Sequence, residues 1–228
     1  MVARSGEQAR IALIEHAERL FAERGIEGVS LRDVSAAAGQ RNHSAAQYHF
    51  GDRQGLVAAV FQARMRIVGE RRQERLDQLL ADGRADDLAA LVRAAIEPLV
   101  EVVAETDGWY GRFLARTRWD TLAADVLVDL PEVSSYRAVV LRIVSLLDMP
   151  VEIRRSRADQ TLTLVVGTIA GWEWARQLGR PRLDQHRLTG ELVSTSIAIL
   201  EAPLATDLAV SPITAGDHRS TDLTGVAP

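Results

Sequence analysis

The sequence predicts an all-α protein, in which a three-helix domain at the N-terminus precedes a larger helical bundle. Two observations favour helices: apolar residues recur at three- and four-residue spacing along most of the chain, and residues that cap or break helices bound these repeats. The composition, 47% hydrophobic and 25% charged over 228 residues, is typical of a globular protein. We therefore predict an N-terminal domain over residues 1–52, a bundle over 53–202 and a disordered tail over 203–228, which is rich in Pro, Thr, Ser and Gly.

The composition also limits the location and chemistry of the protein. Cysteine is absent, which excludes disulfides and thiolate metal sites and suits a cytoplasmic location. Charged residues interrupt both the first twenty residues and the most apolar segments, so we expect neither a signal peptide nor a membrane span. The five histidines are scattered and no catalytic or phosphate-binding motif is found, so we expect no cofactor and no enzyme activity.

Charge is divided unevenly between the two parts of the chain. Residues 1–75 hold 12 arginines and 9 acidic residues, a net charge of +3, whereas residues 76–228 carry a net charge of −7. All basic side chains other than histidine are arginines, and compositional bias of the source genome explains the missing lysines best. The asymmetry indicates that the N-terminal part faces a polyanion and that the rest has a different task.

The first three predicted helices follow the pattern of a helix-turn-helix. A helix over residues 7–24 is stopped by Gly25, and Ser30 with Asp33 forms a capping box at the start of a short second helix. In this pattern, the helix after the turn enters the DNA major groove and the helix before it crosses the phosphate backbone. The pattern therefore predicts binding to double-stranded DNA.

The turn and the third helix carry mainly polar side chains. Gly39 ends the second helix, and Asn42 is the expected cap of the third. Ala45, Ala46 and Phe50 form its buried side, where small alanines let two short helices cross closely. The outer side then presents hydrogen-bonding side chains to a groove: His43, Ser44, Gln47 and Tyr48.

Further helices fill the rest of the chain. Asp52 is the expected cap of a helix that runs from Arg53 to about Glu70, with a possible break near Gly69. The remaining helices are predicted over residues 86–105 with a kink at Pro98, 108–119, 131–147, 151–178 and 185–201.

The N-terminal elements together resemble the DNA-binding domain of the tetracycline-repressor (TetR) family. The resemblance covers roughly residues 7–61, and it rests on Phe21-Ala22-Glu23-Arg24-Gly25, Ser30-Leu31-Arg32-Asp33-Val34, Ala38-Gly39, Tyr48-His49-Phe50 and Arg53 to Leu56. It implies a helix-turn-helix domain followed by a C-terminal bundle for ligand binding and dimerisation. It also implies a homodimeric repressor that binds a pseudo-palindromic operator and is released by a small-molecule effector.

The resemblance assigns candidate DNA contacts. Ser30 and Arg32 match positions from which the family touches DNA, and Arg53 stands where a lysine commonly binds a phosphate. Gln47 replaces a common tyrosine, and one extra residue lies between the glycine of the turn and the expected cap, so the turn is expected to bulge. The candidates are Ser30, Arg32, Arg41, Asn42, His43, Ser44, Gln47, Tyr48, His49 and Arg53.

Several of these residues have a structural alternative. Helix capping is the main role expected for Ser30, Asn42 and Asp52, and packing is as good an explanation for His49 as a phosphate contact. Arg41 has the alternative of a solvated turn residue.

The bundle is the expected site of a small apolar or aromatic effector. All four tryptophans lie in it, and with other aromatic residues they are candidates to line a cavity: Trp109, Tyr110, Phe113, Trp119, Tyr136 and Trp172. Glu173 and three arginines, Arg112, Arg116 and Arg118, are candidate polar anchors. The alternative is that the aromatic residues are ordinary core and the charges ordinary surface.

The last two predicted helices carry more apolar surface than a small bundle needs to bury. The candidates for a dimer interface are Val165, Ile169, Trp172, Leu192, Ser196 and Ile199, unless these residues pack on the core of their own protomer. Two alternative functions remain at this point. One is a DNA-binding dimer without an effector, and the other is an all-α enzyme with an unrecognised site.

Overall fold

The computed structural model describes residues 2–106 and 108–204, and this part of the chain is built from helices without a β-strand. The fold class predicted from the sequence is confirmed. Most of the predicted tail, from residue 205 on, lies outside the described residues. Within the described part, no helix combines the length and the apolar character that crossing a membrane requires.

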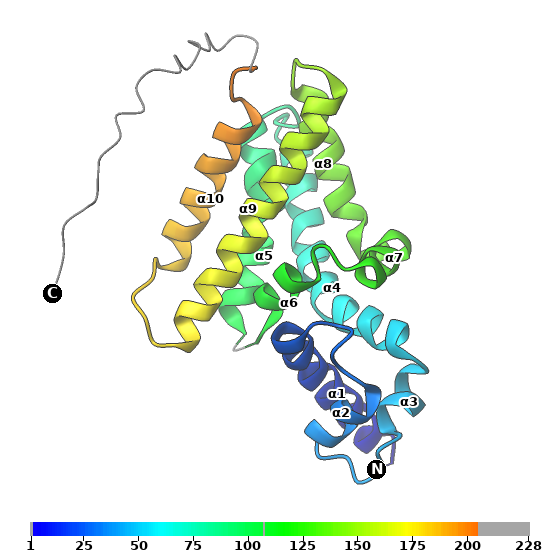
Figure 1. Cartoon of the computed structure of the whole chain (residues 1–228). Coiled ribbons are helices and arrows are strands. Elements are labelled where there is room, and N and C mark those ends of the chain that lie inside the picture. The colour runs from blue at the N-terminus through cyan, green and yellow to red at the C-terminus, as the bar shows by residue number, and fades with distance from the viewer. Residues whose placement is uncertain (1, 107, 205–228) are drawn as a thin grey trace, which may run out of the picture.

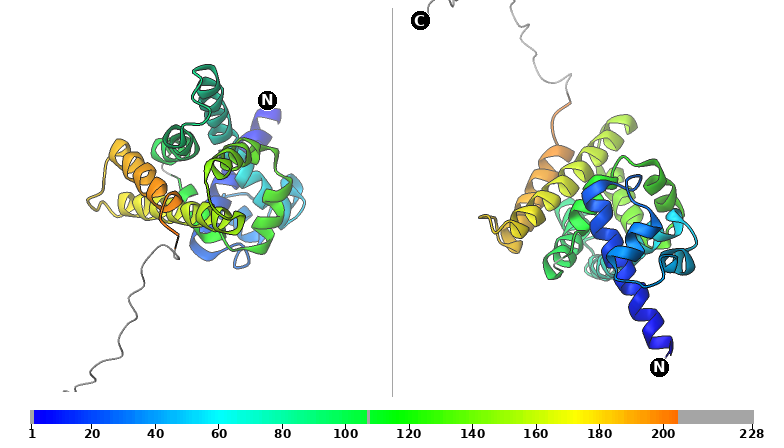
Figure 2. Two further views of the ribbon diagram at one scale, coloured as in Figure 1. Left: turned by 90° about the horizontal axis from the view of Figure 1, so that it is seen from above. Right: turned by 60° about the horizontal axis from the view of Figure 1, so that its bottom comes forward.

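Three helices form a head domain at one end of the molecule: α1 (Val2–Arg24), α2 (Leu31–Ala37) and α3 (Ala45–Phe50). Figure 1 shows them at the lower end, and Figure 2 shows the beginning of α1 projecting past the other two. The core of the head consists of fully buried apolar side chains from all three helices: Leu13, Ala17, Phe21, Val34 and Ala46.

Two helix starts in the head differ from prediction. The first helix begins at Val2 and not near residue 7. The third begins at Ala45, because the side chain of Asn42 accepts a hydrogen bond from the backbone N–H of Ser44 (2.9 Å) and so caps the preceding turn. The prediction that Asn42 caps α3 was wrong. Ser44 occupies the cap position but forms no side-chain capping bond.

A single long helix, α4 (Arg53–Ala81), leads from the head into the bundle. As predicted, Asp52 caps it, accepting from the backbone N–H of Gly55 (2.8 Å). The predicted break near Gly69 and end near Glu70 were wrong. A Cβ atom at position 69 would lie 3.0 Å from the carbonyl oxygen of Glu132, so this glycine permits close packing within a continuous helix.

The remaining helices form the bundle, and most match their predicted ranges. They are α5 (Leu88–Glu105), α6 (Tyr110–Thr117), α7 (Thr121–Asp129), the short 3-10 helix η1 (Pro131–Val133), α8 (Ser134–Leu146), α9 (Val151–Gln177) and α10 (Gln185–Leu200). Helix α7 was not predicted, although Asp120 caps it by accepting from the N–H of Ala123 (3.0 Å). Pro98 lies inside α5, as expected.

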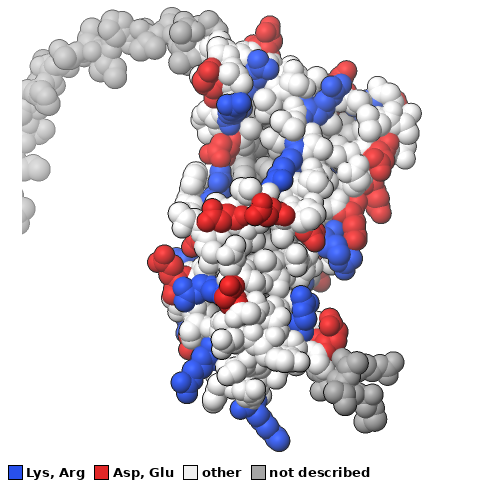
Figure 3. All heavy atoms as spheres, turned by 90° about the vertical axis from the view of Figure 1, so that its right-hand side faces the viewer, with Lys and Arg blue, Asp and Glu red and all other residues white. Residues whose placement is uncertain are grey.

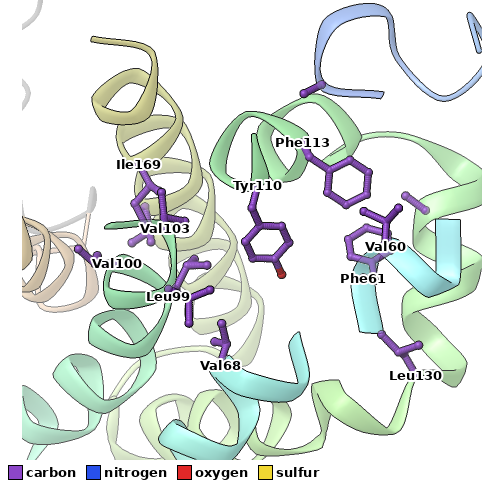
Figure 4. Packing of buried hydrophobic residues seen from close by; sticks show 14 of the residues in the cluster. Val60, Phe61, Val68, Leu99, Val100, Val103, Tyr110, Phe113, Leu130 and Ile169 are labelled. Atoms are coloured by element: carbon purple, nitrogen blue, oxygen red, sulfur yellow. The ribbon is translucent and has the colours of Figure 1, made fainter. Parts of the chain in front are cut away.

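The cores of the head and the bundle are continuous. Phe113 of α6 lies between Phe21 of α1 and Phe61 of α4, with ring centroids 6.2 Å and 4.8 Å away. Figure 4 shows Phe113 and Tyr110 reaching from α6 into this cluster. Helix α6 also packs along α9, so it connects the head with the far side of the bundle.

Candidate nucleic-acid interface and bundle cavity

A buried serine fixes the angle between α2 and α3. The hydroxyl of Ser35 donates to the carbonyl of Leu31 (3.0 Å) and accepts from the backbone N–H of Ala46 (3.0 Å). Because Ser35 and Ala46 are both fully buried, this is the only polar contact available to that N–H in the described core. The sequence analysis did not identify Ser35, although its position opposite the small alanines was a usable signal.

The predicted capping box at the start of α2 is present. The hydroxyl of Ser30 accepts from the N–H of Asp33 (3.1 Å), and the carboxylate of Asp33 accepts from the N–H of Ser30 (2.9 Å). The side-chain and backbone hydrogen bonds from Ser30 lower the pKa of Asp33. Ser30 therefore caps a helix, and it is exposed at the surface of the head.

The structure brings the ten candidate DNA-binding residues to the head, on α2, α3, the turn between them and the start of α4. Nine are exposed, with Tyr48 at 84%, and only His49 is half-buried, between the rings of Tyr48 and Phe50. Eight have side chains without a hydrogen bond or ion pair to the described residues: Arg32, Arg41, His43, Ser44, Gln47, Tyr48, His49 and Arg53. These donors are available to a partner.

The charge distribution of the head fits an anionic partner. In Figure 3, arginine side chains project from the lower end of the visible face, whereas the larger acidic patches lie further up, over the bundle. Further up this face, arginine and acidic side chains are intermingled, so projecting arginines mark the lower end.

A cavity of about 260 Å³ lies inside the bundle, between α4, α5, α6, α8 and α9. Its wall is mainly apolar, and two of the six predicted ligand residues, Tyr110 and Tyr136, are part of it. Phe113 is fully buried in the adjoining core and does not line the cavity. Trp109, Trp119 and Trp172 do not line it either.

Trp109 and Trp119 lie outside the cavity wall, and arginines stack on their rings. The guanidinium of Arg112 lies 4.4 Å from the ring centroid of Trp109, and that of Arg118 lies 4.3 Å from Trp119, which is 72% exposed. The indole N–H of Trp172 donates to the carbonyl of Leu183 in the loop before α10 (2.7 Å). Their assignment to the cavity wall is corrected: cation–π contacts and a loop contact occupy them.

Of the predicted polar anchors, only Arg118 lines the cavity, and it forms an ion pair with Asp159. Arg112 and Arg116 do not line it. A further arginine, Arg72 of α4, lines the cavity and is 5% exposed. It was missed because the predicted helix ended too early. Its signal was an arginine in the apolar stripe that contains Met65, Val68 and Leu79.

Glu173 of α9 is fully buried and caps α6. Its two carboxylate oxygens accept from the N–H groups of Gly111 (3.2 Å) and Arg112 (2.9 Å). Burial raises the pKa of Glu173 to about 7, and this effect outweighs the two hydrogen bonds, which lower it. The residue predicted as a ligand anchor thus holds α6 against α9.

A second buried carboxylate connects α6 with the head. Glu18 of α1 accepts from Nε of Arg64 on α4 (2.8 Å) and from the backbone N–H of Trp109 (3.0 Å). A Cβ atom at Gly108 would lie 2.8 Å from this carboxylate, so the glycine leaves room for the side chain of Glu18. Helices α1, α4 and α6 therefore share one polar contact at the boundary between the head and the bundle.

The predicted dimer residues are mostly turned toward the protomer core. Val165, Ile169, Trp172, Leu192 and Ser196 are buried, and only Ile199 is partly exposed. This part of the prediction needs correction, because the apolar stripes of α9 and α10 pack on the protomer itself. The outer sides of these helices carry small residues instead: an added Cβ at Gly167, Gly171 or Gly190 would meet nothing within 4 Å.

The fold of the head and its exposed donors define its class, a helix-turn-helix domain. Residues 13–60, from α1 into the start of α4, match the family model described as bacterial regulatory proteins, tetR family. The match covers the head and the beginning of α4, so the head is similar to the DNA-binding domain of that family. A comparison with curated proteins finds no match.

Three solved structures resemble the whole chain distantly. An alanine-substituted HlyIIR mutant has 14% identity and a TM-score of 0.48, over 83% of this chain and 96% of that one. The superantigen pfit has 19% identity and a TM-score of 0.48, over 81% and 86%. A TetR-family transcriptional regulator from Pectobacterium atrosepticum has 24% identity and a TM-score of 0.39, over 89% and 97%. These likenesses carry no information on function.

Proposed function

We propose that the protein is a cytoplasmic, homodimeric repressor that binds a pseudo-palindromic operator and is released from it by a small molecule bound in the bundle cavity. One observation carries the proposal: the long helix α4 connects an exposed polar surface on α2 and α3 with a mainly apolar cavity in the bundle.

The DNA-binding part is supported by the free donors of the head. We assign phosphate contacts to Tyr48 and Arg53, because a phenol hydroxyl and a guanidinium both suit backbone oxygens. His43, Ser44 and Gln47 face the groove, where Gln47 can read an adenine edge. Ser30, Arg32, Arg41, Asn42 and His49 complete the surface, as helix-terminal and turn residues beside the backbone.

The dimer is supported by the outer face of α9 and α10. Figure 1 shows the two helices side by side at one edge of the molecule. Three of their glycines, Gly167, Gly171 and Gly190, have open space around an added Cβ and would let the helices of a second protomer approach closely. Pairing places two heads on one duplex, which raises affinity because the second head binds as part of the same molecule.

Release is supported by the position of α4. Its N-terminus follows α3 directly, and its side chains Phe61, Met65, Val68 and Arg72 form one wall of the cavity. A ligand that fits one tilt of α4 better than another shifts the population of head positions. The dimer then loses the spacing that matches the operator.

The test begins with selection of bound fragments from genomic DNA by the full-length protein. On the enriched sequence, Arg53→Ala and Tyr48→Ala should each weaken binding. Because each protomer of the dimer loses one phosphate contact, Arg53→Ala should lower the slope of log K against log salt by about 1.8. Arg66→Ala is the matched control, because Arg66 is exposed on α4 beyond the head and, among the described residues, pairs only with Glu70. Failure to enrich any sequence, or equal losses in the control, would contradict the proposal.

A further inference from the structure

The cavity contains a buried positive charge without an acidic partner. Arg72 donates to the carbonyl of Ala95, from Nε (3.4 Å) and Nη2 (3.2 Å), and from Nη1 to the hydroxyl of Ser135 (3.5 Å). All three contacts are long and go to neutral acceptors. No carboxylate of the described residues lies within ion-pair distance of this guanidinium.

The neighbouring arginines of α4, unlike Arg72, have acidic partners. Arg71 pairs with Glu101 (3.3 Å) and Glu105 (2.7 Å), and Arg75 pairs with Glu97 (3.4 Å) and Glu101 (2.5 Å). Acidic residues of α5 thus neutralise the two half-exposed arginines, whereas the more deeply buried Arg72 receives none. A buried charge without a counterion is costly, because water cannot solvate it.

The guanidinium nevertheless stays charged at neutral pH. Burial is the largest effect on Arg72 and lowers its pKa to about 10, which is still well above neutrality. The ring of Tyr136 lies 5.3 Å from the guanidinium carbon and gives only a cation–π contact. An anion that entered the cavity would supply the missing counterion.

The rest of the wall suits hydrocarbon. Apolar side chains surround the cavity from several helices, including Phe61, Met65, Leu99, Leu162 and Val165. Tyr110 also lines it, and Figure 4 shows its hydroxyl directed from α6 toward α4. An occupant must therefore combine an apolar body with one polar end.

We propose that the effector is an apolar carboxylic acid whose carboxylate pairs with Arg72 and whose hydrocarbon body fills the bundle cavity. The inference rests on the proposed effector site and adds the chemical class of its ligand. Guanidinium and carboxylate can form two parallel hydrogen bonds, which makes the pair strong and directional. The carboxylate would also act directly on α4, the helix that carries the head.

The cavity wall contains two other charged side chains, and neither replaces Arg72 as the partner of a ligand carboxylate. Arg118 is neutralised by Asp159 and stacks on Trp119. Glu132 has one buried carboxylate oxygen without a hydrogen-bond partner in the described residues, and it would favour a cationic ligand. Glu132 is only half-buried, however, so water competes for its charge more than for that of Arg72.

The experiment compares three ligands of matched chain length on the full-length protein: decanoate, 1-decanol and decylamine. Calorimetry measures binding, and fluorescence anisotropy measures release of the selected operator. Decanoate should bind about 10- to 100-fold more tightly than decanol, as expected for a hydrogen bond between charged groups, and should release the operator. Decanol binding as tightly as decanoate, or a preference for decylamine, would overturn the inference.

Variants locate the charge. Arg72→Met should abolish the preference for the acid over the alcohol, and Arg72→Lys should keep part of it. Arg66→Met, the same change at an exposed position of α4, should leave the preference unchanged. An acid preference that survives Arg72→Met would overturn the inference. If Arg72→Met does not fold, the comparison of the three ligands on the unmodified protein still decides.

The outcomes separate this inference from the proposed function. Release of the operator by decanol alone would retain the effector-gated repressor and reject the carboxylate. If the protein binds no operator, the proposed repressor function is rejected. Calorimetry would still measure whether a carboxylate binds at Arg72. Failure of all three ligands to bind would reject the inference and leave the DNA-binding result unaffected.

Discussion

At the scale of single residues, the head combines one buried polar contact with many free polar side chains. Ser35 holds α2 and α3 together from inside, and its hydroxyl satisfies a backbone N–H that has no access to water. Tyr48, Gln47 and Arg53 lie outside and have no partner in the described chain. The buried serine thus determines the geometry in which the exposed residues are presented.

Replacing Ser35 by alanine should destabilise the protein by about 1 to 3 kcal/mol, because the N–H of Ala46 would remain buried without an acceptor. Denaturant unfolding measures the loss, and operator affinity should fall with it. Ser44→Ala is the matched control: Ser44 is exposed and makes no side-chain capping bond, so its effect on stability should stay within about 0.5 kcal/mol. Equal stability of the two variants would show that the hydroxyl of Ser35 does not hold α2 and α3 together.

At the scale of elements, α6 is short but holds several parts together. Glu173 of α9 caps its N-terminal N–H groups, Glu18 of α1 accepts from the residue before it, and Phe113 fills the core between head and bundle. Tyr110 of the same helix lines the cavity. A change in the cavity can therefore reach α1 through α6 as well as through α4.

The cap of α6 predicts a specific pH dependence. Since the folded-state pKa of Glu173 is raised from 4.5 to about 7, the folded chain binds more protons than the unfolded chain between these values. Its contribution to the free energy of unfolding is therefore largest at low pH and declines as the pH rises from 4.5 to 7, by about 3 kcal/mol in all.

The variant Glu173→Gln removes this titration, so the unfolding free energy of wild type minus that of the variant should fall by about 3 kcal/mol as the pH rises from 4.5 to 7. Unfolding in denaturant at several pH values from 4.5 to 7.5 measures it. Glu191→Gln, at an exposed position of α10, should give a curve parallel to wild type. Parallel curves for Glu173→Gln as well would show that its carboxyl does not titrate in this range.

At the scale of the whole molecule, the head and the bundle form one folded unit. The core runs without interruption through Phe21, Phe113 and Phe61, and the Glu18–Arg64 pair crosses the same boundary. Figure 2 shows the head grouped at one end, while α9 and α10 occupy one side of the bundle. This arrangement leaves the proposed DNA-binding surface and the proposed dimer face free at the same time.

Placing an arginine at position 167 should dissociate the proposed dimer. The protomer should still fold, because nothing lies within 4 Å of an added Cβ at Gly167. Sedimentation velocity should show a monomer, and operator affinity should fall about 100-fold or more as the advantage of two linked heads is lost. Leu141→Arg, at an exposed position of α8, is the control. A Gly167→Arg protein that remains as dimeric as wild type would move the interface elsewhere.

The head and most helix boundaries could be predicted from the sequence, because their signals act over a few residues. Ser30 with Asp33, Asp52, Asp120 and Pro131 cap or open helices through contacts with the next turn of the chain. Of these, only the Asp120 signal was overlooked. The exposed donors of the head follow from the same local pattern, since a helix with alanines on one side must present its polar residues on the other.

Tertiary structure alone decided which side chains face the cavity and which face solvent. Trp119 and Trp109 stack with arginines, Ile169 and Leu192 pack inward, and Arg72 lies buried beside the cavity. Each outcome depends on which neighbouring helix covers a given face, and that is set by contacts between residues far apart in the chain. Amphipathic spacing identifies an apolar side of a helix, but the environment of that side arises only when the helices pack.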